Sequence, residues 1–296
     1  LITGGTGLVG SSISEIVQNT DHELIYLSRN PGKNKFNIPE FHWDPDRDII
    51  EKKALDGTDI IINLAGATLN KRWTPEYKSI ILRSRVDGTR LIFNTIQKEK
   101  LPIKALVSAS AVGYYQNSYE KEYTESDPPG NDFLSQVCQK WEQEAQNFEE
   151  LGVRVTRMRI GIVLSNKGGA LPQIVKPIKF GAGAPLGNGN QWMAWIHLKD
   201  LAKMFIHAAE DETMSGAYNA VGPYSVTNKE LTKEAANVLN RPLILPKVPE
   251  TALKMALGEM AEIALASNKC SNKKILESGF KYRFTNLKDA LTDLLD

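Results

Sequence analysis

The sequence predicts an α/β protein, with a doubly wound, mostly parallel sheet and a smaller, mostly helical C-terminal lobe. Through the first half of the chain, apolar runs typical of buried strands alternate with segments of helical period. A glycine-rich loop joins the first of these strands to the first helix. After residue 159 the alternation ends, and glycine-rich segments and short helices follow. Right-handed crossovers between parallel strands then give the doubly wound topology.

The strands and helices of the first half are expected in strict alternation. The runs that indicate strands are Leu1–Thr3, Glu23–Ser28, Asp59–Ala65, Ala105–Ala109 and Val153–Arg159. The segments between them with apolar residues near i, i+3, i+4 and i+7 are Val9–Asn19, Pro75–Lys98 and Phe133–Leu151. Because Leu1–Thr3 reads as the end of a strand, we expect a few native residues to precede it.

The second half is expected to return once to the sheet. A strand in MAWIHL (193–198), a helix over Lys199–Glu210 and a strand over Ala217–Ala220 indicate this return. Further helices are predicted over Asn228–Leu239, Pro249–Ala266 and Leu287–Leu295. The sequence therefore predicts a dinucleotide-binding domain of residues 1–165 and 193–222, and a C-terminal lobe of residues 166–192 and 223–296.

Composition excludes several classes of partner. Lys and Arg number 36 against 35 Asp and Glu, a net charge of +1, so a general binder of nucleic acid or of anionic membranes is not expected. No apolar run approaches the ~18 residues of a membrane span. Cys138, Cys270 and the four scattered histidines match neither a disulfide framework nor a metal site. The two cysteines fit a reducing, cytoplasmic setting.

The segment TGGTGLVG, residues 3–10, is the strongest functional signal. Gly4, Gly7 and Gly10 lie directly after a predicted strand and directly before a predicted helix. A tight turn and the close approach of a pyrophosphate both require residues without Cβ, and the helix start offers unpaired N–H groups to the phosphates. This position in an alternating series predicts a Rossmann dinucleotide site, although glycines also occur in turns for purely steric reasons.

The end of the second strand selects the dinucleotide. NAD sites usually carry Asp or Glu here to bind the ribose hydroxyls. Instead the strand ends in Ser28–Arg29, no acid occurs from Ser28 through Pro39, and Lys33 and Lys35 follow. An arginine here can pair with a 2′-phosphate. The sequence favours NADP(H) over NAD(H); the alternative is a solvated basic turn.

Two later segments are further candidates for the same site. NLAG, Asn63–Gly66, closes the third strand with small residues that allow a ring or ribose to approach, although small residues also suit helix–strand packing. Arg85, in the following helix, could face the cofactor or, as an isolated arginine, the solvent.

The chain resembles the extended short-chain dehydrogenase/reductases, and within them the atypical epimerase-like family with a short C-terminal helical domain. The matching motifs are GGTGLVG, LSRNPG, NLAG, RWTPEYK…SR, SASAVGYY, FL…CQKWE, RIGIVLS, WIHLKDLA, YNAVGP and LKMALGEMAE…SNK…GFKYRF. The resemblance implies an NADP(H)-binding Rossmann domain and a C-terminal lobe that closes over a small-molecule substrate. The predicted cofactor contacts are Gly4, Thr6, Gly7, Leu8, Val9, Gly10, Ser28, Arg29, Leu64, Ala65, Gly66 and Arg85.

The resemblance is incomplete at the catalytic positions. Active members of the wider group use a tyrosine as acid/base four residues before a lysine that holds the ribose. None of the nine tyrosines has a lysine at i+4. One alignment of the relevant helix places Gln136 and Lys140 at these positions, and another places Leu134 and Cys138. The first alignment keeps the lysine but has no tyrosine, and the second alignment has neither the tyrosine nor the lysine.

Substitutes for the missing pair are nevertheless present. Ser110 in SASAVGYY matches the serine that orients the substrate oxygen in relatives. Tyr114 or Tyr115 could handle the proton and Lys140 could hold the ribose, whereas each tyrosine could equally be a packing residue. Glu125 and Asp127 are expected in a turn, and His197 with Asp200 in a structural role. Trp73, Trp192 and Trp195 could line a pocket or a core, and the glycines from Gly181 to Gly189 could form a lid or a plain loop.

These observations predict an NADP(H)-binding oxidoreductase or epimerase acting on a sugar-like or other small carbonyl or hydroxyl substrate. The alternative is a non-catalytic NADP(H) sensor or scaffold, which the missing Tyr-x-x-x-Lys pair favours. By analogy with related folds, a homodimer could form through Pro75–Lys98 and Phe133–Leu151.

Overall fold

The computed structural model describes all 296 residues, and a central eight-stranded sheet organises it. The strand order is β12-β8-β6-β5-β1-β2-β3-β4, and only the β3–β4 pair at one edge is antiparallel. In chain order the strands are β1 (Ile2–Thr3), β2 (Tyr26–Ser28), β3 (Glu40–Asp44), β4 (Ile49–Ile50), β5 (Ile60–Asn63), β6 (Ala105–Ala111), β8 (Arg154–Ile160) and β12 (Gly216–Ala220). The strand order reverses at β1, as in doubly wound dinucleotide-binding folds, and the predicted fold class is confirmed.

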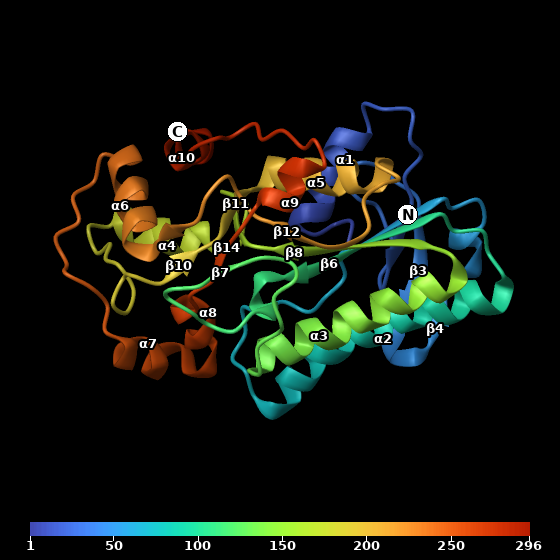
Figure 1. Cartoon of the computed structure of the whole chain (residues 1–296), viewed down its shortest axis with the longest axis horizontal. Coiled ribbons are helices and arrows are strands. Elements are labelled where there is room, and N and C mark those ends of the chain that lie inside the picture. The colour runs from blue at the N-terminus through green and yellow to red at the C-terminus, as the bar shows by residue number, and fades with distance from the viewer.

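Helices cover both faces of this sheet. Helices α1 (Leu8–Val17) and α5 (Leu198–Glu210) lie on one face, and α2 (Pro75–Glu99) and α3 (Phe133–Gln146) lie on the other, as Figure 1 shows. The core under α1 and α5 includes Ile2, Val107 and Phe205, and a second core forms under α2 and α3. Alternating residues of the strands therefore supply two separate cores.

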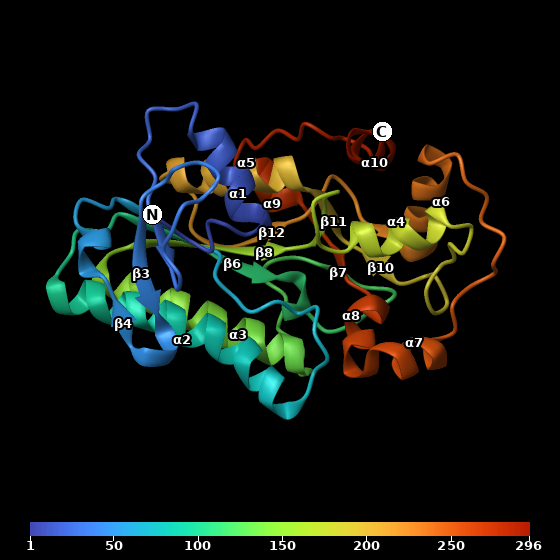
Figure 2. The ribbon, with the colours of Figure 1, turned by 180° about the vertical axis from the view of Figure 1, so that it is seen from behind.

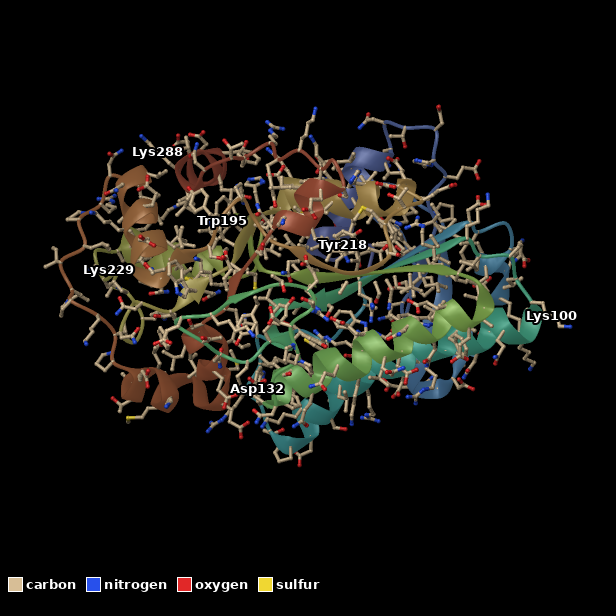
Figure 3. The ribbon with its side chains drawn as sticks, viewed as in Figure 1. Lys100, Asp132, Trp195, Tyr218, Lys229 and Lys288 are labelled. Atoms are coloured by element: carbon tan, nitrogen blue, oxygen red, sulfur yellow. The ribbon has the colours of Figure 1, made fainter.

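The starts of α2 and α3 are fixed by their capping residues. The Thr74 side chain accepts a hydrogen bond from the Tyr77 N–H, and Pro75 occupies the first turn of α2. The Asp132 side chain accepts one from the Ser135 N–H. Figure 3 places Asp132 at the end of α3 that lies nearest the C-terminal lobe. The caps thus set which residues of α3 come closest to that lobe.

The C-terminal lobe is assembled from separate segments around a core of its own. Its helices are α4 (Leu171–Lys179), α6 (Asn228–Val238), α7 (Glu250–Leu257), α8 (Ala261–Leu265) and α10 (Leu287–Leu295). The short strands beside them are β9 (Ile162–Leu164) paired with β11 (Trp195–His197), and β10 (Trp192–Met193) paired with β13 (Val226–Thr227). No helix of the protein combines the length and the apolar composition needed to cross a membrane.

The chain returns to the large domain a second time, which the sequence-based division at residue 223 did not anticipate. Strand β14 (Lys269–Cys270) pairs with β7 (Glu122–Tyr123), and α9 (Lys273–Glu277) follows it. Ile275 and Phe280 are buried in the core beneath α1 and α5. This segment of the predicted C-terminal lobe therefore packs on the sheet domain.

Three other local expectations need correction. Strand β3 is an additional parallel neighbour of β2 that was not predicted, and its presence is clear in Figure 2. Helix α4 lies between two glycine-rich segments, where no helix was predicted. The helix predicted over Pro249–Ala266 is broken at Gly258, whose φ of +60° a helix cannot accommodate.

Candidate functional site: a dinucleotide cavity and a buried ionic network

The glycine loop forms a tight turn at the carboxyl end of β1. Gly4 has a φ of +70°, and its carbonyl accepts a hydrogen bond of 3.0 Å from the Gly7 N–H. A Cβ on Gly10 would lie 2.5 Å from the Gly4 carbonyl oxygen, so α1 can approach the turn only without a side chain there. No side chain caps the start of α1, which leaves its first N–H groups available to an anionic ligand.

A cavity of about 1000 Å³ opens beside this loop. Its walls come from the glycine loop, the carboxyl ends of β2 and β5, the segment after β3 and the first half of α2. The predicted contacts Gly4, Thr6, Ser28, Arg29, Ala65 and Gly66 line it, whereas Gly7, Leu8, Val9, Gly10, Leu64 and Arg85 do not. Its place at the reversal of strand order is where dinucleotides bind in such sheets.

The charge lining this cavity is predominantly positive. Four cations line it, and none forms a salt bridge within the protein: Arg29, Lys33, Lys35 and Arg83. The lining acids are Glu40 and Asp46, and Glu40 accepts hydrogen bonds from the Gly32 N–H and the Asn34 amide. Unpaired cations around one cavity fit a ligand that carries several phosphate charges.

The wall between β1 and β5 is held by a hydroxyl. Thr3 Oγ1 accepts hydrogen bonds of 3.1 Å from the N–H groups of Leu64 and Ala65, and donates one of 2.8 Å to Asn63 Oδ1. Leu64 therefore contributes to the cavity wall between β1 and β5 through its backbone N–H, which is bonded to Thr3. Trp43, Arg83 and Ser84 also line the cavity and were not singled out from the sequence. Trp43 lies on the unpredicted β3, and the helical position of Arg83 carries no signal distinguishing it from a surface residue.

Ser110 lies at the carboxyl end of β6 and takes part in a buried ionic network. Its hydroxyl, in a side chain 2% exposed, donates a hydrogen bond of 2.7 Å to Glu142 Oε1. Arg159 holds both oxygens of this carboxylate, through Nε at 2.8 Å and Nη2 at 2.9 Å. Burial acts to lower the pKa of Arg159, and Glu142 outweighs it, so the net shift is upward. The guanidinium is therefore held in its charged form by Glu142.

The two candidate tyrosines lie in different surroundings. Tyr115 is buried; its hydroxyl donates to Asn219 Oδ1 at 2.7 Å and accepts from Arg159 Nη1 at 2.9 Å. Burial raises the pKa of Tyr115, although Arg159 partly opposes that change. Tyr114 is only partly buried, and its ring lies 3.5 Å from the Arg159 guanidinium carbon. The hydroxyl of Tyr115 thus has both a hydrogen-bond acceptor and a hydrogen-bond donor within the protein, whereas the hydroxyl of Tyr114 has neither.

Helix α3 presents one face to Ser110, and Lys140 is not on it. Residues four apart lie on the same side of a helix, so Leu134, Cys138 and Glu142 share a face. Cys138 is buried against Ser110; burial and then Glu142 raise its pKa to about 12, with Arg85 opposing them. Lys140 and Gln136 are exposed. The structure favours the alignment that places Leu134 and Cys138 at the tyrosine and lysine positions, and it places Lys140 on a face of α3 turned away from Ser110.

Arg85 lies behind the cavity wall rather than in it. Its Nη1 donates to the carbonyls of Ala67 and Ile81, at 3.3 and 3.0 Å. A Cβ on Gly66 would lie 2.9 Å from the guanidinium carbon. Gly66, which lines the cavity, therefore lies directly against this cation.

The C-terminal lobe touches the same end of α2 and α3. Lys78 in α2 forms an ion pair with Glu259, and Met260 packs into a cluster with Trp73, Phe133 and Leu134. Figures 1 and 2 both show α8 beside this end of the two helices. The two lobes thus meet beside the face of α3 that carries Leu134.

The remaining candidates are mostly structural. His197 caps α5 by accepting a hydrogen bond from the Lys199 N–H, and Asp200 accepts two from the Arg283 and Phe284 N–H groups. Asp127 closes a turn, as expected, whereas Glu125 reaches across to accept a hydrogen bond from the Asn219 N–H at 2.8 Å. Trp73 and Trp195 are buried in cores, and the half-buried Trp192 donates to the Tyr119 carbonyl.

Comparisons with known proteins agree with this architecture. Residues 1–221 match the model of the NAD dependent epimerase/dehydratase family, and residues 248–294 match a domain of unknown function, DUF1731. The epimerase family protein YfhF of Bacillus subtilis is 39% identical over 296 residues, which cover 99% of this chain and 97% of that protein. A Staphylococcus aureus epimerase family protein is 38% identical over 297 residues, which cover 100% of this chain and 98% of that one.

A solved structure provides the same comparison in three dimensions. The human epimerase family protein SDR39U1, crystallised with NADPH, is 31% identical and superposes with a TM-score of 0.88 over 99% of this chain and 97% of its own. With the glycine loop and the cavity in the expected places, this chain belongs to the NAD-dependent epimerase/dehydratase family.

Proposed function

We propose that this protein binds NADP(H) in the cavity beside the glycine loop. The observation that carries the proposal is Arg29: it directly follows β2, lines the same cavity as the glycine loop and has no carboxylate partner. The pyrophosphate would lie at the start of α1, and the 2′-phosphate of the adenosine half would pair with the Arg29 guanidinium. That the human relative was crystallised with NADPH supports the same ligand here.

The test is calorimetric titration of the protein with NADPH and NADH. A charge-assisted contact with the 2′-phosphate contributes roughly 1.5–3 kcal/mol, or a factor of about 10–100 in Kd. We expect NADPH to bind more tightly than NADH by about this factor, and Arg29→Ala to remove most of the difference. Arg241→Ala removes an exposed arginine of the C-terminal lobe and is the matched control. Tighter binding of NADH, or binding of neither, contradicts the proposal.

We further propose that the bound coenzyme exchanges hydride with a small carbonyl or hydroxyl substrate held between the two lobes. Ser110 would anchor the substrate oxygen, and Tyr114 would handle the proton, because the hydroxyl of Tyr115 is already paired at both its donor and acceptor sides. A sugar-like substrate undergoing oxidation or epimerisation fits this chemistry. Ser110→Ala is expected to lower turnover more than it lowers NADPH affinity; an equal loss of both argues against the assignment.

A non-catalytic NADP(H) sensor or scaffold is the second candidate function. One observation favours it: the face of α3 nearest Ser110 carries Leu134 and Cys138, and the Ser110 hydroxyl is donated to Glu142. Purified protein that binds NADPH tightly, yet oxidises none of it across a broad panel of aldehydes, ketones and keto sugars, would select the sensor. Oxidation of NADPH with any member of the panel would select the enzyme.

A further inference from the structure

Two segments with exposed apolar side chains lie side by side at one end of the C-terminal lobe. One is the turn that follows α4, where Phe180 is 80% exposed. The other is the segment of residues 241–249 between α6 and α7, where Ile244 is 75% exposed and Leu245 is 48% exposed. Figures 1 and 2 both show this second segment at the end of the molecule farthest from β3 and β4.

Contacts between the two segments fix their position. A Cβ on Gly183 would lie 3.0 Å from Leu243 Cδ2, and Leu243 packs against the core of the C-terminal lobe. Further along, the Val248 N–H donates a hydrogen bond of 2.8 Å to the Pro185 carbonyl. The apolar residues between these two contacts are left projecting into solvent.

The charge around these apolar residues is entirely positive. Every charged side chain of α4, of the turn after it and of residues 241–249 is an exposed cation, and none forms a salt bridge: Lys176, Lys179, Arg241 and Lys247. The chain has no acid from residue 166 to 199 or from residue 235 to 249. The acids that flank the second range are occupied, because Glu234 accepts a hydrogen bond from the Asn237 amide and Glu250 pairs with Lys254. We call the four cations, with Phe180, Ile244 and Leu245, the distal surface.

The distal surface has the chemistry that adsorbs to an anionic lipid bilayer. Cations near such a bilayer are attracted to the lipid phosphates, and apolar side chains among them enter the boundary between headgroups and acyl chains. Side chains as exposed as Phe180 and Ile244 project individually, so they present little flat apolar surface on which a folded protein could pack. The net charge of +1 argues against a general attraction of the chain to anionic membranes, but it averages over this local excess of cations.

We propose that the protein adsorbs to anionic phospholipid bilayers through the distal surface. Phe180 and Ile244 enter the acyl boundary, and the four cations lie against the headgroup phosphates. The coenzyme cavity is lined by the glycine loop, β2 and the segment after β3, away from this end of the molecule. The proposal is therefore independent of coenzyme binding.

The test is co-sedimentation of the whole protein with vesicles of phosphatidylcholine alone, or of equal parts phosphatidylcholine and phosphatidylglycerol. We expect binding only to vesicles that contain phosphatidylglycerol, and weaker binding as salt is added, because salt screens exposed charges. The double variant Lys176→Glu, Lys179→Glu should weaken binding by more than about twentyfold, since each cation near an anionic bilayer contributes about a factor of five. The matched control, Lys98→Glu with Lys100→Glu, makes the same change in net charge at exposed positions and should have a much smaller effect. Figure 3 shows Lys100 at the opposite end of the molecule.

A second variant tests insertion of the apolar side chains. Phe180→Ser with Ile244→Ser keeps the net charge and should weaken vesicle binding about tenfold or more. Both side chains are exposed, so thermal unfolding without vesicles should not change.

Four results would overturn the proposal. They are no binding to either kind of vesicle, equal binding to both kinds, an equal loss in the control and in the Lys176 and Lys179 variant, and unchanged binding of the serine variant. If no vesicle is bound and the serine variant instead lowers the mass found by sedimentation equilibrium, the distal surface is an interface with another copy of the chain.

Discussion

The Ser110 hydroxyl donates a hydrogen bond of 2.7 Å to Glu142, 32 residues later in the chain. Glu142 is in turn held by both Nε and Nη2 of Arg159. The serine at the end of β6 is thus oriented by a buried ion pair that joins α3 to β8. A hydroxyl whose proton is donated to a carboxylate offers a ligand only its lone pairs. A substrate hydroxyl can therefore donate to Ser110 as it stands, whereas a substrate carbonyl could be anchored only if the Ser110 proton turned away from Glu142.

Replacing Glu142 should destabilise the protein strongly. Glu142→Gln keeps the side-chain shape but leaves the buried Arg159 without a counter-charge, and breaking such a pair costs about 3–5 kcal/mol. Urea unfolding measures the change in the free energy of unfolding. The control is Glu144→Gln, two residues further along α3, whose partner Arg90 is half exposed; its effect should stay below about 1 kcal/mol. Equal effects of the two variants would show that the ion pair is not a stabilising element.

The adjacent tyrosines form a matched pair of variants. Tyr115→Phe removes a hydroxyl that has two buried partners, Asn219 and Arg159, and should lower the free energy of unfolding by about 1–3 kcal/mol. Tyr114→Phe removes a hydroxyl with no partner in the protein and keeps the ring over Arg159. Its effect on stability should stay within about 0.5 kcal/mol. Similar losses in both variants would contradict the hydrogen-bond assignment.

Stability should fall on mild acidification because of His197. Burial lowers its pKa from 6.5 to about 4 in the folded protein, more than the charge of Asp293 raises it. The unfolded chain therefore binds the proton first, and the contribution of neutral His197 is complete above pH 6.5 and lost as the pH falls toward 4. A fall in the pKa of His197 from 6.5 to about 4 corresponds to about 3 kcal/mol of stability.

Unfolding measured between pH 7.5 and pH 4 tests this expectation. His197→Asn can still cap α5 but cannot titrate, so its stability should depend less on pH over this range. An unchanged slope in the variant would assign the acid sensitivity to other groups.

The turn at the cofactor loop should tolerate no side chain at its last glycine. Gly10→Ala places a Cβ 2.5 Å from the Gly4 carbonyl oxygen, which is backbone and cannot rotate away. We expect a loss of about 1–3 kcal/mol in stability, together with weaker NADPH binding. Gly32→Ala meets no atom within 4 Å and is the steric control. A stable Gly10→Ala protein with normal affinity would show that α1 can move away from the turn.

The sheet and the coenzyme loop could be predicted because their signals are local. The runs that became β5 and β6 are apolar and buried on both faces, and the glycines precede a helix directly. Strand β3 was missed because EFHWD alternates polar and apolar residues over only five positions. Helix α4 was missed because it contains Pro177, a residue that ordinarily interrupts helices.

The buried network could not be predicted because its members are far apart in sequence. Glu142 on an amphipathic helix resembles a surface residue until its partner is known. Arg159 gave the one available signal: a charged residue at the end of a strand buried on both faces requires a buried counter-charge. The sequence nevertheless offered no means of choosing Glu142 among the acids of α3.

The second return of the chain to the sheet has a consequence for dissection of this protein. Ile275 and Phe280 complete the core beneath α1 and α5, although they follow most of the C-terminal lobe in the sequence. A fragment ending near residue 221, where the epimerase match ends, would leave that core open to water. The coenzyme-binding half should therefore not be obtainable as an independent folding unit by simple truncation.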